Sequence, residues 1–245
     1  GPAAAADVRD FCAQRPGRAT PPCILDAGHL QLEVGLADGT FLRHGGEHED
    51  IDVYAAPALR YGLTPRLEFE ASTAPAIVDA QRGEGRQVGV GDTTFGLMGA
   101  LTDPDGKGPA VSLNGFVTGP TATHGLGNGG WTGGLRLPVA GPLGDSLSYA
   151  LMPEVDVLRD ADGGGTHLAW TAVGGLSRAF GPLSLGTELW GQIEDAPEGR
   201  ITRATADLTA AVMTGPAMQL DAGAAIGLNR QTPDLELYVG VARRF

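Results

Sequence analysis

The sequence predicts an all-β protein folded as a single closed antiparallel transmembrane β-barrel of about 12 strands. Three observations lead to this fold class. Apolar residues alternate with small or polar ones from Gly28 to the C-terminus. The connections between the alternating segments are short and long in turn, and charged residues gather on one face of the segments.

The composition excludes several other classes. The chain has 245 residues, of which 39 are glycine and 42% are hydrophobic, and its formal net charge is −12. Disorder does not fit this apolar content, and glycine and proline every few residues argue against long helices. The acidic charge would repel phosphate backbones, so we expect no nucleic-acid partner.

Strict alternation with period two predicts strands rather than helices. In the first segment, Leu30, Leu32 and Val34 fall on one face, and Gln31 and Glu33 fall on the other. The twelve predicted strands are residues 29–38, 51–63, 67–77, 94–101, 111–118, 131–139, 147–157, 168–180, 183–193, 203–212, 218–228 and 235–245. Their length suits a tilted strand that crosses a bilayer, which needs about 9–11 residues, and exceeds the usual length in soluble proteins, about 5–6 residues.

The connections predict the orientation of the barrel. The short ones are residues 64–66, 103–108, 141–145, 181–182 and 214–217, and the longer ones are 39–50, 79–90, 121–130, 159–167, 194–200 and 229–234. Short periplasmic turns and longer extracellular loops are typical of outer-membrane barrels.

Aromatic residues on the apolar face predict two girdles at the membrane interfaces. Tyr61, Phe69, Tyr149, Phe180 and Phe245 fall near the short turns, and Phe95, Trp131 and Trp170 fall near the long loops.

Charged residues on the opposite face predict a polar lumen, because a charge facing lipid at mid-depth costs about 2–4 kcal/mol. The predicted lumen-lining residues are Glu33, Asp52, Tyr54, Arg60, Glu68, Glu70, Phe116, Arg136, Glu154, Asp156, Glu188, Trp190, Arg203, Asp207, Asp221, Glu236 and Arg244. Acidic residues outnumber basic ones, so an open pore would favour cations. A salt-bridged filling of the bore is an equal alternative.

The N-terminal residues 1–27 form an irregular segment, which we expect on the periplasmic side, before the barrel of residues 28–245. Cys12 and Cys23 are the only cysteines, and their spacing suits a local disulfide, which implies an oxidising compartment. Two free thiols are the alternative. The segment either caps or plugs the periplasmic mouth, or it is an untethered leader left over after export.

We expect neither a metal site, a cofactor nor a catalytic centre. His44, His48, His124 and His167 fall in predicted loops, and the sequence has no GxSxG motif. An HxxxH pair would need a helix to align it, and the first loop is rich in glycine.

Three stretches of the sequence resemble known motifs: one resembles an assembly signal, and two resemble motifs of a single family. The last strand, LELYVGVARRF, ends in Phe245 and resembles the terminal assembly signal of bacterial outer-membrane proteins. VGVGDTTFGL at 88–97 and FVTGPT at 116–121 resemble motifs of the transporter-like outer-membrane family of the MetA-pathway of phenol degradation. Where that family often has Pro-Thr-Gly, this chain has Gly119-Pro120-Thr121.

The resemblance implies an outer-membrane channel for small aromatic or hydrophobic compounds. The expected partners are outer-membrane lipid and lipopolysaccharide, the barrel-assembly machinery through Phe245, and a small solute of unknown identity. A closed barrel with a structural or loop-mediated role is the second interpretation, and a membrane enzyme is the third.

Overall fold

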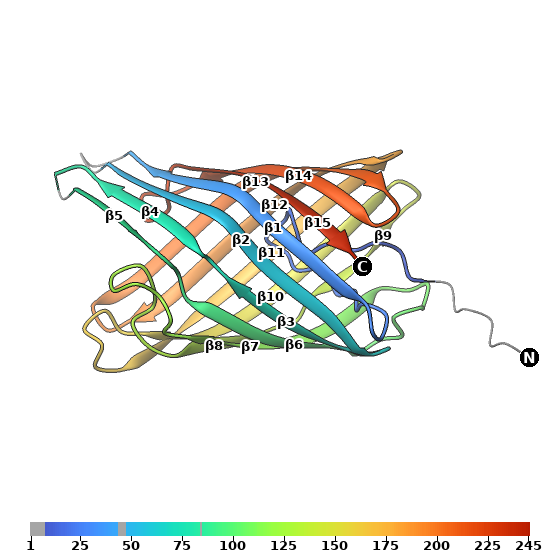
Figure 1. Ribbon diagram of the computed structural model, residues 1–245, viewed down its shortest axis with the longest axis horizontal. Coiled ribbons are helices and arrows are strands. Elements are labelled where there is room, and N and C mark those ends of the chain that lie inside the picture. The colour runs from blue at the N-terminus through green and yellow to red at the C-terminus, as the bar shows by residue number, and fades with distance from the viewer. Residues whose placement is uncertain (1–7, 44–47, 84) are drawn as a thin grey trace, which may run out of the picture.

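The chain forms a closed, tilted β-barrel, shown by a computed structural model that describes residues 8–43, 48–83 and 85–245 (Figure 1). Each strand pairs with its neighbours in antiparallel fashion, in the order β1-β15-β14-β13-β12-β11-β10-β8-β7-β6-β3-β2. Among the described residues, no helix is long and apolar enough to cross a membrane. The predicted fold class is confirmed.

The strands occupy most of the chain beyond residue 29. They are β1 (Leu30–Leu42), β2 (Glu49–Thr64), β3 (Leu67–Thr73), β4 (Ala76–Gln81), β5 (Gly85–Gly89), β6 (Thr93–Ala100), β7 (Ala110–Gly119), β8 (Thr132–Arg136), β9 (Val139–Leu143), β10 (Leu147–Arg159), β11 (Thr166–Phe180), β12 (Leu183–Ala196), β13 (Gly199–Gly215), β14 (Met218–Gly227) and β15 (Leu235–Arg244).

In the described part of the chain, fifteen strand segments make twelve barrel strands, because three barrel strands are interrupted. β3 and β4 both pair with β2 and are separated at Ala74 and Pro75. β8 and β9 both pair with β7 and β10 and are separated at Leu137 and Pro138. A proline, which lacks the backbone N–H that the ladder requires, lies at each of these two interruptions. β5 and β6 are separated at residues 90–92.

The barrel closes through β1, which pairs with β2 on one side and with β15 on the other. Gln31, for example, lies opposite both Arg60 and Arg244. Closure gives the backbone groups of the terminal strands a partner, which hydrocarbon cannot provide.

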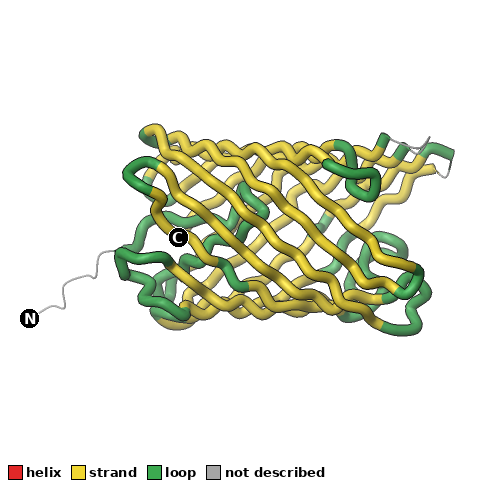
Figure 2. Tube along the Cα trace, turned by 180° about the vertical axis from the view of Figure 1, so that it is seen from behind, coloured by secondary structure: helices red, strands yellow, loops and turns green. Residues whose placement is uncertain are grey.

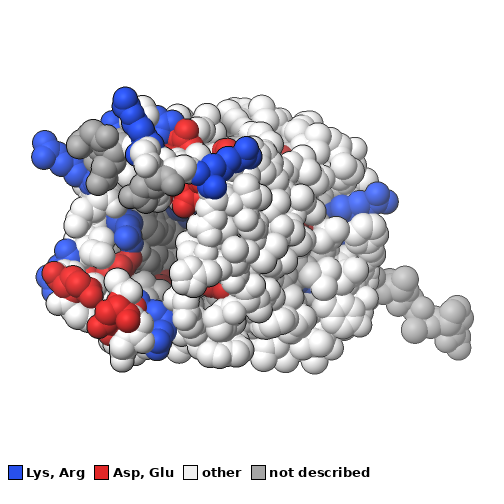
Figure 3. Space-filling view, turned by 60° about the vertical axis from the view of Figure 1, so that its left-hand side comes forward, with Lys and Arg blue, Asp and Glu red and all other residues white. Residues whose placement is uncertain are grey.

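The two faces of the barrel are inverted relative to a soluble protein. Leu189 is 64% exposed and Leu208 is 60% exposed on the outer face, whereas the inward-facing Arg60 and Glu68 are fully buried. The outer wall in Figure 3 is free of charge over its middle, and charged side chains gather at the rim and in the hollow at the end of the barrel. This is the arrangement that a lipid-facing wall requires.

Four neighbouring barrel strands become irregular at one level. β1 has a bulge at Leu36, and Ala55 of β2 has a φ of 52°. The next strand is interrupted at Pro75, and Gly91 interrupts the fourth, where its N–H donates to the Ala74 carbonyl at 2.7 Å. Beyond this level the strands continue as an extension of the barrel wall, at the upper left of Figure 1.

This irregularity makes the predicted lumen positions of Asp52 and Tyr54 wrong. Asp38 lies opposite Tyr238, whose buried side chain faces the lumen, so the next residue, Gly39, faces outward. Gly39 lies opposite Asp52, and Tyr54, which is 43% exposed, shares that outer face. The extra residues in β1 and β2 shift the alternation by one, which moves these side chains to the other face.

Several predicted connections are also wrong in length. Residues 79–90 and 194–200 are mostly hairpin strands with tight turns, because β4, β5, β12 and β13 extend into them. The predicted short turn at 103–108 belongs to a longer connection, residues 101–109. Figure 2 shows the connections at both ends of the barrel from behind.

The predicted girdle residues belong to the outer face, with Trp131 at 64% and Phe245 at 60% exposure. Phe69 and Phe95 were expected in separate girdles, but their ring centroids are 6.3 Å apart and the rings are stacked. The tilt of the strands brings the two rings to the same level of the barrel. The prediction that Phe69 and Phe95 belong to two different girdles is therefore wrong.

Replacing Leu189, which lies in the middle of β12, by arginine should lower the free energy of unfolding in lipid vesicles by about 2–4 kcal/mol. The matched variant Leu228→Arg, just beyond β14 and 56% exposed, should lose only about 0–1 kcal/mol, because the cost falls towards the interface. Denaturant titration of both variants measures the difference. Equal losses would contradict the placement of the wall in hydrocarbon.

Candidate functional site

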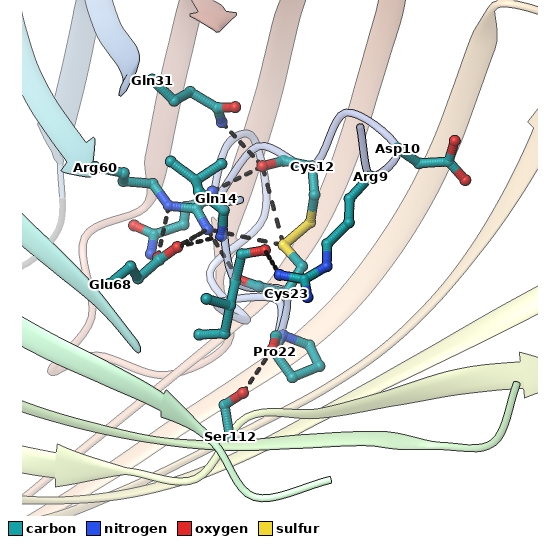
Figure 4. Close-up of a disulfide and its surroundings, with 12 residues drawn as sticks. Arg9, Asp10, Cys12, Gln14, Pro22, Cys23, Gln31, Arg60, Glu68 and Ser112 are labelled. Atoms are coloured by element: carbon teal, nitrogen blue, oxygen red, sulfur yellow. Dashed lines mark hydrogen bonds and ion pairs between the residues drawn. A yellow bond between two sulfur atoms is a disulfide. The ribbon is translucent and has the colours of Figure 1, made fainter. Parts of the chain in front are cut away.

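The described part of the N-terminal segment, residues 8–27, lies inside the barrel and contacts its wall (Figures 1 and 4). It contains the predicted disulfide between Cys12 and Cys23, whose Cα atoms are 6.5 Å apart. Leu25 is 4% exposed and Ile24 is 3% exposed. The lumen is therefore shared between wall side chains and this segment.

Carboxylates of the wall accept hydrogen bonds from the backbone of the segment. Glu33 accepts from the N–H groups of Gln14 and Arg15 at 3.0 Å. Glu188 accepts from the N–H of Arg18 at 2.6 Å, and Glu68 accepts from that of Leu25 at 2.9 Å. These bonds satisfy backbone donors that the irregular segment cannot satisfy by secondary structure.

Arg60 connects the disulfide loop to the wall (Figure 4). Its guanidinium forms ion pairs with Glu68 at 2.9 Å and Glu33 at 3.4 Å, and donates to the carbonyls of Cys12 at 2.7 Å and Cys23 at 2.9 Å. All three charged side chains are at most 1% exposed. A buried charge of this kind is tolerated only because its donors are satisfied.

Two arginines of the segment reach the opposite part of the wall. Arg15 pairs with Asp221 at 3.0 Å, and Arg18 pairs with Asp207 at 2.9 Å and with Glu236. The guanidinium of Arg15 lies 5.8 Å from the ring centroid of Tyr238, and that of Arg18 lies 5.3 Å from the ring of Trp190. Cation–π contacts of this kind stabilise the two guanidinium cations inside the lumen.

Close packing also holds the segment. Ala19 forms a small apolar cluster with Met152 and Val173 of the wall. Asp26 lies so near Gly62 that a Cβ at Gly62 would collide with its carbonyl oxygen. Glycine is therefore required at residue 62 for the segment to approach β2.

A cavity of about 210 Å³ lies between the segment and the wall formed by β2, β3, β6, β7 and β8. Glu70, Asn114, Phe116 and Arg136 line it, together with Gln14 of the segment. Asn114 donates to Glu70 at 2.6 Å, and the Arg136 guanidinium lies 4.3 Å from the Phe116 ring centroid. The cavity therefore offers acceptors, donors and an aromatic ring to a small solute.

A second cavity, of about 170 Å³, lies on the other side of the segment, where Arg18, Trp190, Arg203 and Glu236 line it. Arg203 also pairs with Glu194.

His167 lies close to this charged group and is not in a loop, as the sequence had suggested, but in β11, where its side chain hydrogen-bonds Asp160 at 2.8 Å. His44 lies outside the described residues. Among those described, no group of three or more potential metal ligands could hold a metal ion.

Arg9 joins the N-terminal segment to the connection formed by residues 101–109 at one end of the barrel. It donates to Asp105 at 2.6 Å and lies 3.6 Å from Asp26. The hydrogen bond from Arg9 lowers the pKa of the Asp105 carboxyl below its ordinary value. Arg244 donates to the Arg9 carbonyl at 2.7 Å, and its guanidinium lies 5.9 Å from the ring of Phe11. These contacts join the segment to the last strand.

Apart from Asp52 and Tyr54, the structure places the predicted lumen residues on the inner face. These are Glu33, Arg60, Glu68, Glu70, Phe116, Arg136, Glu154, Asp156, Glu188, Trp190, Arg203, Asp207, Asp221, Glu236 and Arg244. The sequence reasoning missed Asn114, Arg15 and Arg18 as lumen groups. The predicted lumen face carries more carboxylates than arginines, and buried charges require partners. This excess indicates that arginines from outside the strands, such as Arg15 and Arg18, enter the lumen.

The sequence matches the protein family described as "Putative MetA-pathway of phenol degradation" over residues 13–245, which confirms the resemblance noted above. Similar solved structures include the NanC porin (TM-score 0.56, 9% identity, 87% of this chain and 98% of that chain) and the KdgM porin (TM-score 0.55, 10% identity, 89% and 99%). The β domain of the Bordetella autotransporter Brka is also similar (TM-score 0.53, 16% identity, 90% and 100%). At such identities these structures show the fold alone. A search of curated proteins found no match.

Replacing Arg60 by methionine should lower the free energy of unfolding by about 3–5 kcal/mol, because it leaves Glu33 and Glu68 buried without their cation. The matched variant Arg178→Met removes a charge from the exposed outer face and should change stability by less than about 1 kcal/mol. Denaturant midpoints measured in detergent compare the two. Adding Glu68→Gln to the Arg60 variant should restore part of the loss, and equal midpoints for both single variants would refute the buried cluster.

Proposed function

Since the chain belongs to the family described as "Putative MetA-pathway of phenol degradation", we propose that it carries small solutes passively across a bacterial outer membrane. The observation that carries this proposal is the pair of cavities, each lined in part by charged side chains, inside a barrel whose outer wall is apolar. Such a barrel provides a polar route through hydrocarbon without any chemical step.

The size and lining of the larger cavity limit the solute. About 210 Å³ suits a small organic molecule and is below the range of about 300–1,000 Å³ that holds drug-sized ligands. Phe116 supplies an aromatic contact, and Asn114 and Arg136 supply hydrogen-bonding groups. Together with the family description, these residues support small aromatic or hydrophobic compounds that carry a polar group.

The acidic residues of the lumen support a preference for cations over anions. Glu70 lies in the larger cavity and Glu236 lies in the smaller one. Carboxylates along a pore attract cations and repel anions, so small anions should cross least readily.

The contact of the last strand with Arg9 of the N-terminal segment supports the orientation. Arg244 contacts the N-terminal segment at one end of the barrel, next to the connection that holds Asp105. In an outer-membrane barrel the shorter turns and the chain ends face the periplasm. Phe245, which is 60% exposed, is then accessible to the barrel-assembly machinery, and the outer belt contacts lipid and lipopolysaccharide.

A closed barrel with a structural or loop-mediated role is the second candidate. The dense contacts of the N-terminal segment favour it, because the segment divides the bore into small cavities. An enzymatic role has less support, since the similar structures are porins and an autotransporter domain.

Purified protein in planar bilayers should produce discrete current steps, and vesicles that contain it should take up small phenols faster than disaccharides, because the cavity is too small for the latter. Ion currents and solute uptake measure the two effects. Vesicles with the protein denatured before reconstitution provide the control. Silence at every voltage together with uptake at the rate of empty vesicles would favour the closed barrel.

A further inference from the structure

Three carboxylates of β13 to β15, namely Asp207, Asp221 and Glu236, are paired with arginines of the N-terminal segment. Within the described residues, the ion pairs of Asp207, Asp221 and Glu236 are all formed with Arg15 or Arg18. Asp207 and Asp221 have fully buried side chains. These carboxylates are therefore neutralised by a part of the chain that is not a barrel strand.

Other carboxylates of the wall pair with arginines of the strands themselves. Arg60 of β2 pairs with Glu68 of β3, and Arg136 of β8 lies 3.4 Å from Glu154 of β10. Arg203 of β13 pairs with Glu194 of β12. Displacement of the N-terminal segment would leave these pairs in place, because both partners belong to strands.

The contacts also show that the segment is fitted to this wall. Gly240 lies beside Arg15, and a side chain at that position would overlap the guanidinium. Gly17 lies beside Glu188, whose carboxylate accepts from the N–H of Arg18. The absence of side chains at both glycines lets the arginines reach the carboxylates.

We propose that Arg15 and Arg18 are the selectivity-determining residues of the lumen. They neutralise Asp207, Asp221 and Glu236 of β13 to β15 and so moderate the preference for cations that the wall alone would impose. This inference rests on the proposed channel function. It assigns ionic selectivity to the N-terminal segment rather than to the strands.

The consequence for ion passage follows from Coulomb's law. Arg18 lines the cavity of about 170 Å³ together with Glu236, so its charge acts directly on an ion in that cavity. Two unit charges about 8 Å from an ion in water, screened by salt at about 0.1 M, change the ratio of cation to anion permeability roughly fivefold, since each charge acts in opposite senses on the two ions. Neutral solutes should respond much less.

The test is the reversal potential of reconstituted full-length protein in a KCl gradient. The variant Arg15→Gln/Arg18→Gln should raise the permeability ratio of K⁺ to Cl⁻ roughly fivefold relative to the unchanged protein. The variant Asp207→Asn/Asp221→Asn retains the arginines and should shift the ratio in the opposite direction. Heat-modifiable migration on gels verifies that each variant is folded.

The matched control is Arg178→Gln/Arg243→Gln, which removes two arginines from the exposed outer face. It removes the same charge from the molecule and should leave the reversal potential unchanged, because the outer positions do not face the ion path. A shift equal to that of the Arg15 and Arg18 variant would show a general effect of net charge and overturn the assignment.

The outcomes separate the two proposals. If the unchanged protein conducts and neither lumen variant shifts the reversal potential, the assignment of selectivity fails and the channel remains. If the arginine variant does not fold, the Asp207→Asn/Asp221→Asn variant tests the assignment. A shift of its reversal potential towards anion selectivity supports the assignment, and an unchanged reversal potential overturns it. If only the arginine variant conducts, the unchanged protein is not a channel, and the assignment of selectivity, which rests on the channel function, fails with it. If no variant conducts, both proposals fail.

Discussion

The backbone must satisfy its own hydrogen bonds in a medium that offers none, and the rest of the structure depends on this constraint. The pairing of β1 with both β2 and β15 meets it by closing the sheet. Closure also separates two environments, because every strand then presents one face to lipid and the other to an enclosed lumen. Arg60 and Leu189, which are fully buried and 64% exposed respectively, lie on opposite sides of this division.

The enclosed lumen in turn requires that charges be paired. The guanidinium of Arg60 forms ion pairs with Glu33 and Glu68. It also donates hydrogen bonds to the carbonyls of Cys12 and Cys23 in the disulfide loop. The N-terminal segment is thus part of the electrostatic interior rather than an appendage. Its disulfide restricts the conformations open to this irregular chain and should add about 2–3 kcal/mol of stability to a loop of this length. Cavities of about 210 and 170 Å³ remain between this segment and the wall.

The sequence predicted the twelve barrel strands and most inward-facing residues, because alternation with period two is a direct consequence of strand geometry. It failed at Asp52 and Tyr54, where a bulge at Leu36 and a left-handed residue at Ala55 shift the alternation without changing the apolar pattern. Hairpin lengths at residues 79–90 were also missed, since strands that leave the membrane continue to pair. The partners of Arg15 and Arg18 depend on distant strands, and no local pattern encodes such pairs.

The two tryptophans of β11 and β12 allow the most direct test of which face meets lipid. Trp170 is 54% exposed on the outer wall, whereas Trp190 lies inside, against Arg18. Variants that retain only Trp170 or only Trp190, with Trp131 also replaced, can be reconstituted with lipids brominated along their acyl chains, which quench tryptophan fluorescence on contact. The account predicts strong quenching of Trp170 and little quenching of Trp190. Equal quenching of both, or quenching of Trp190 alone, would contradict it.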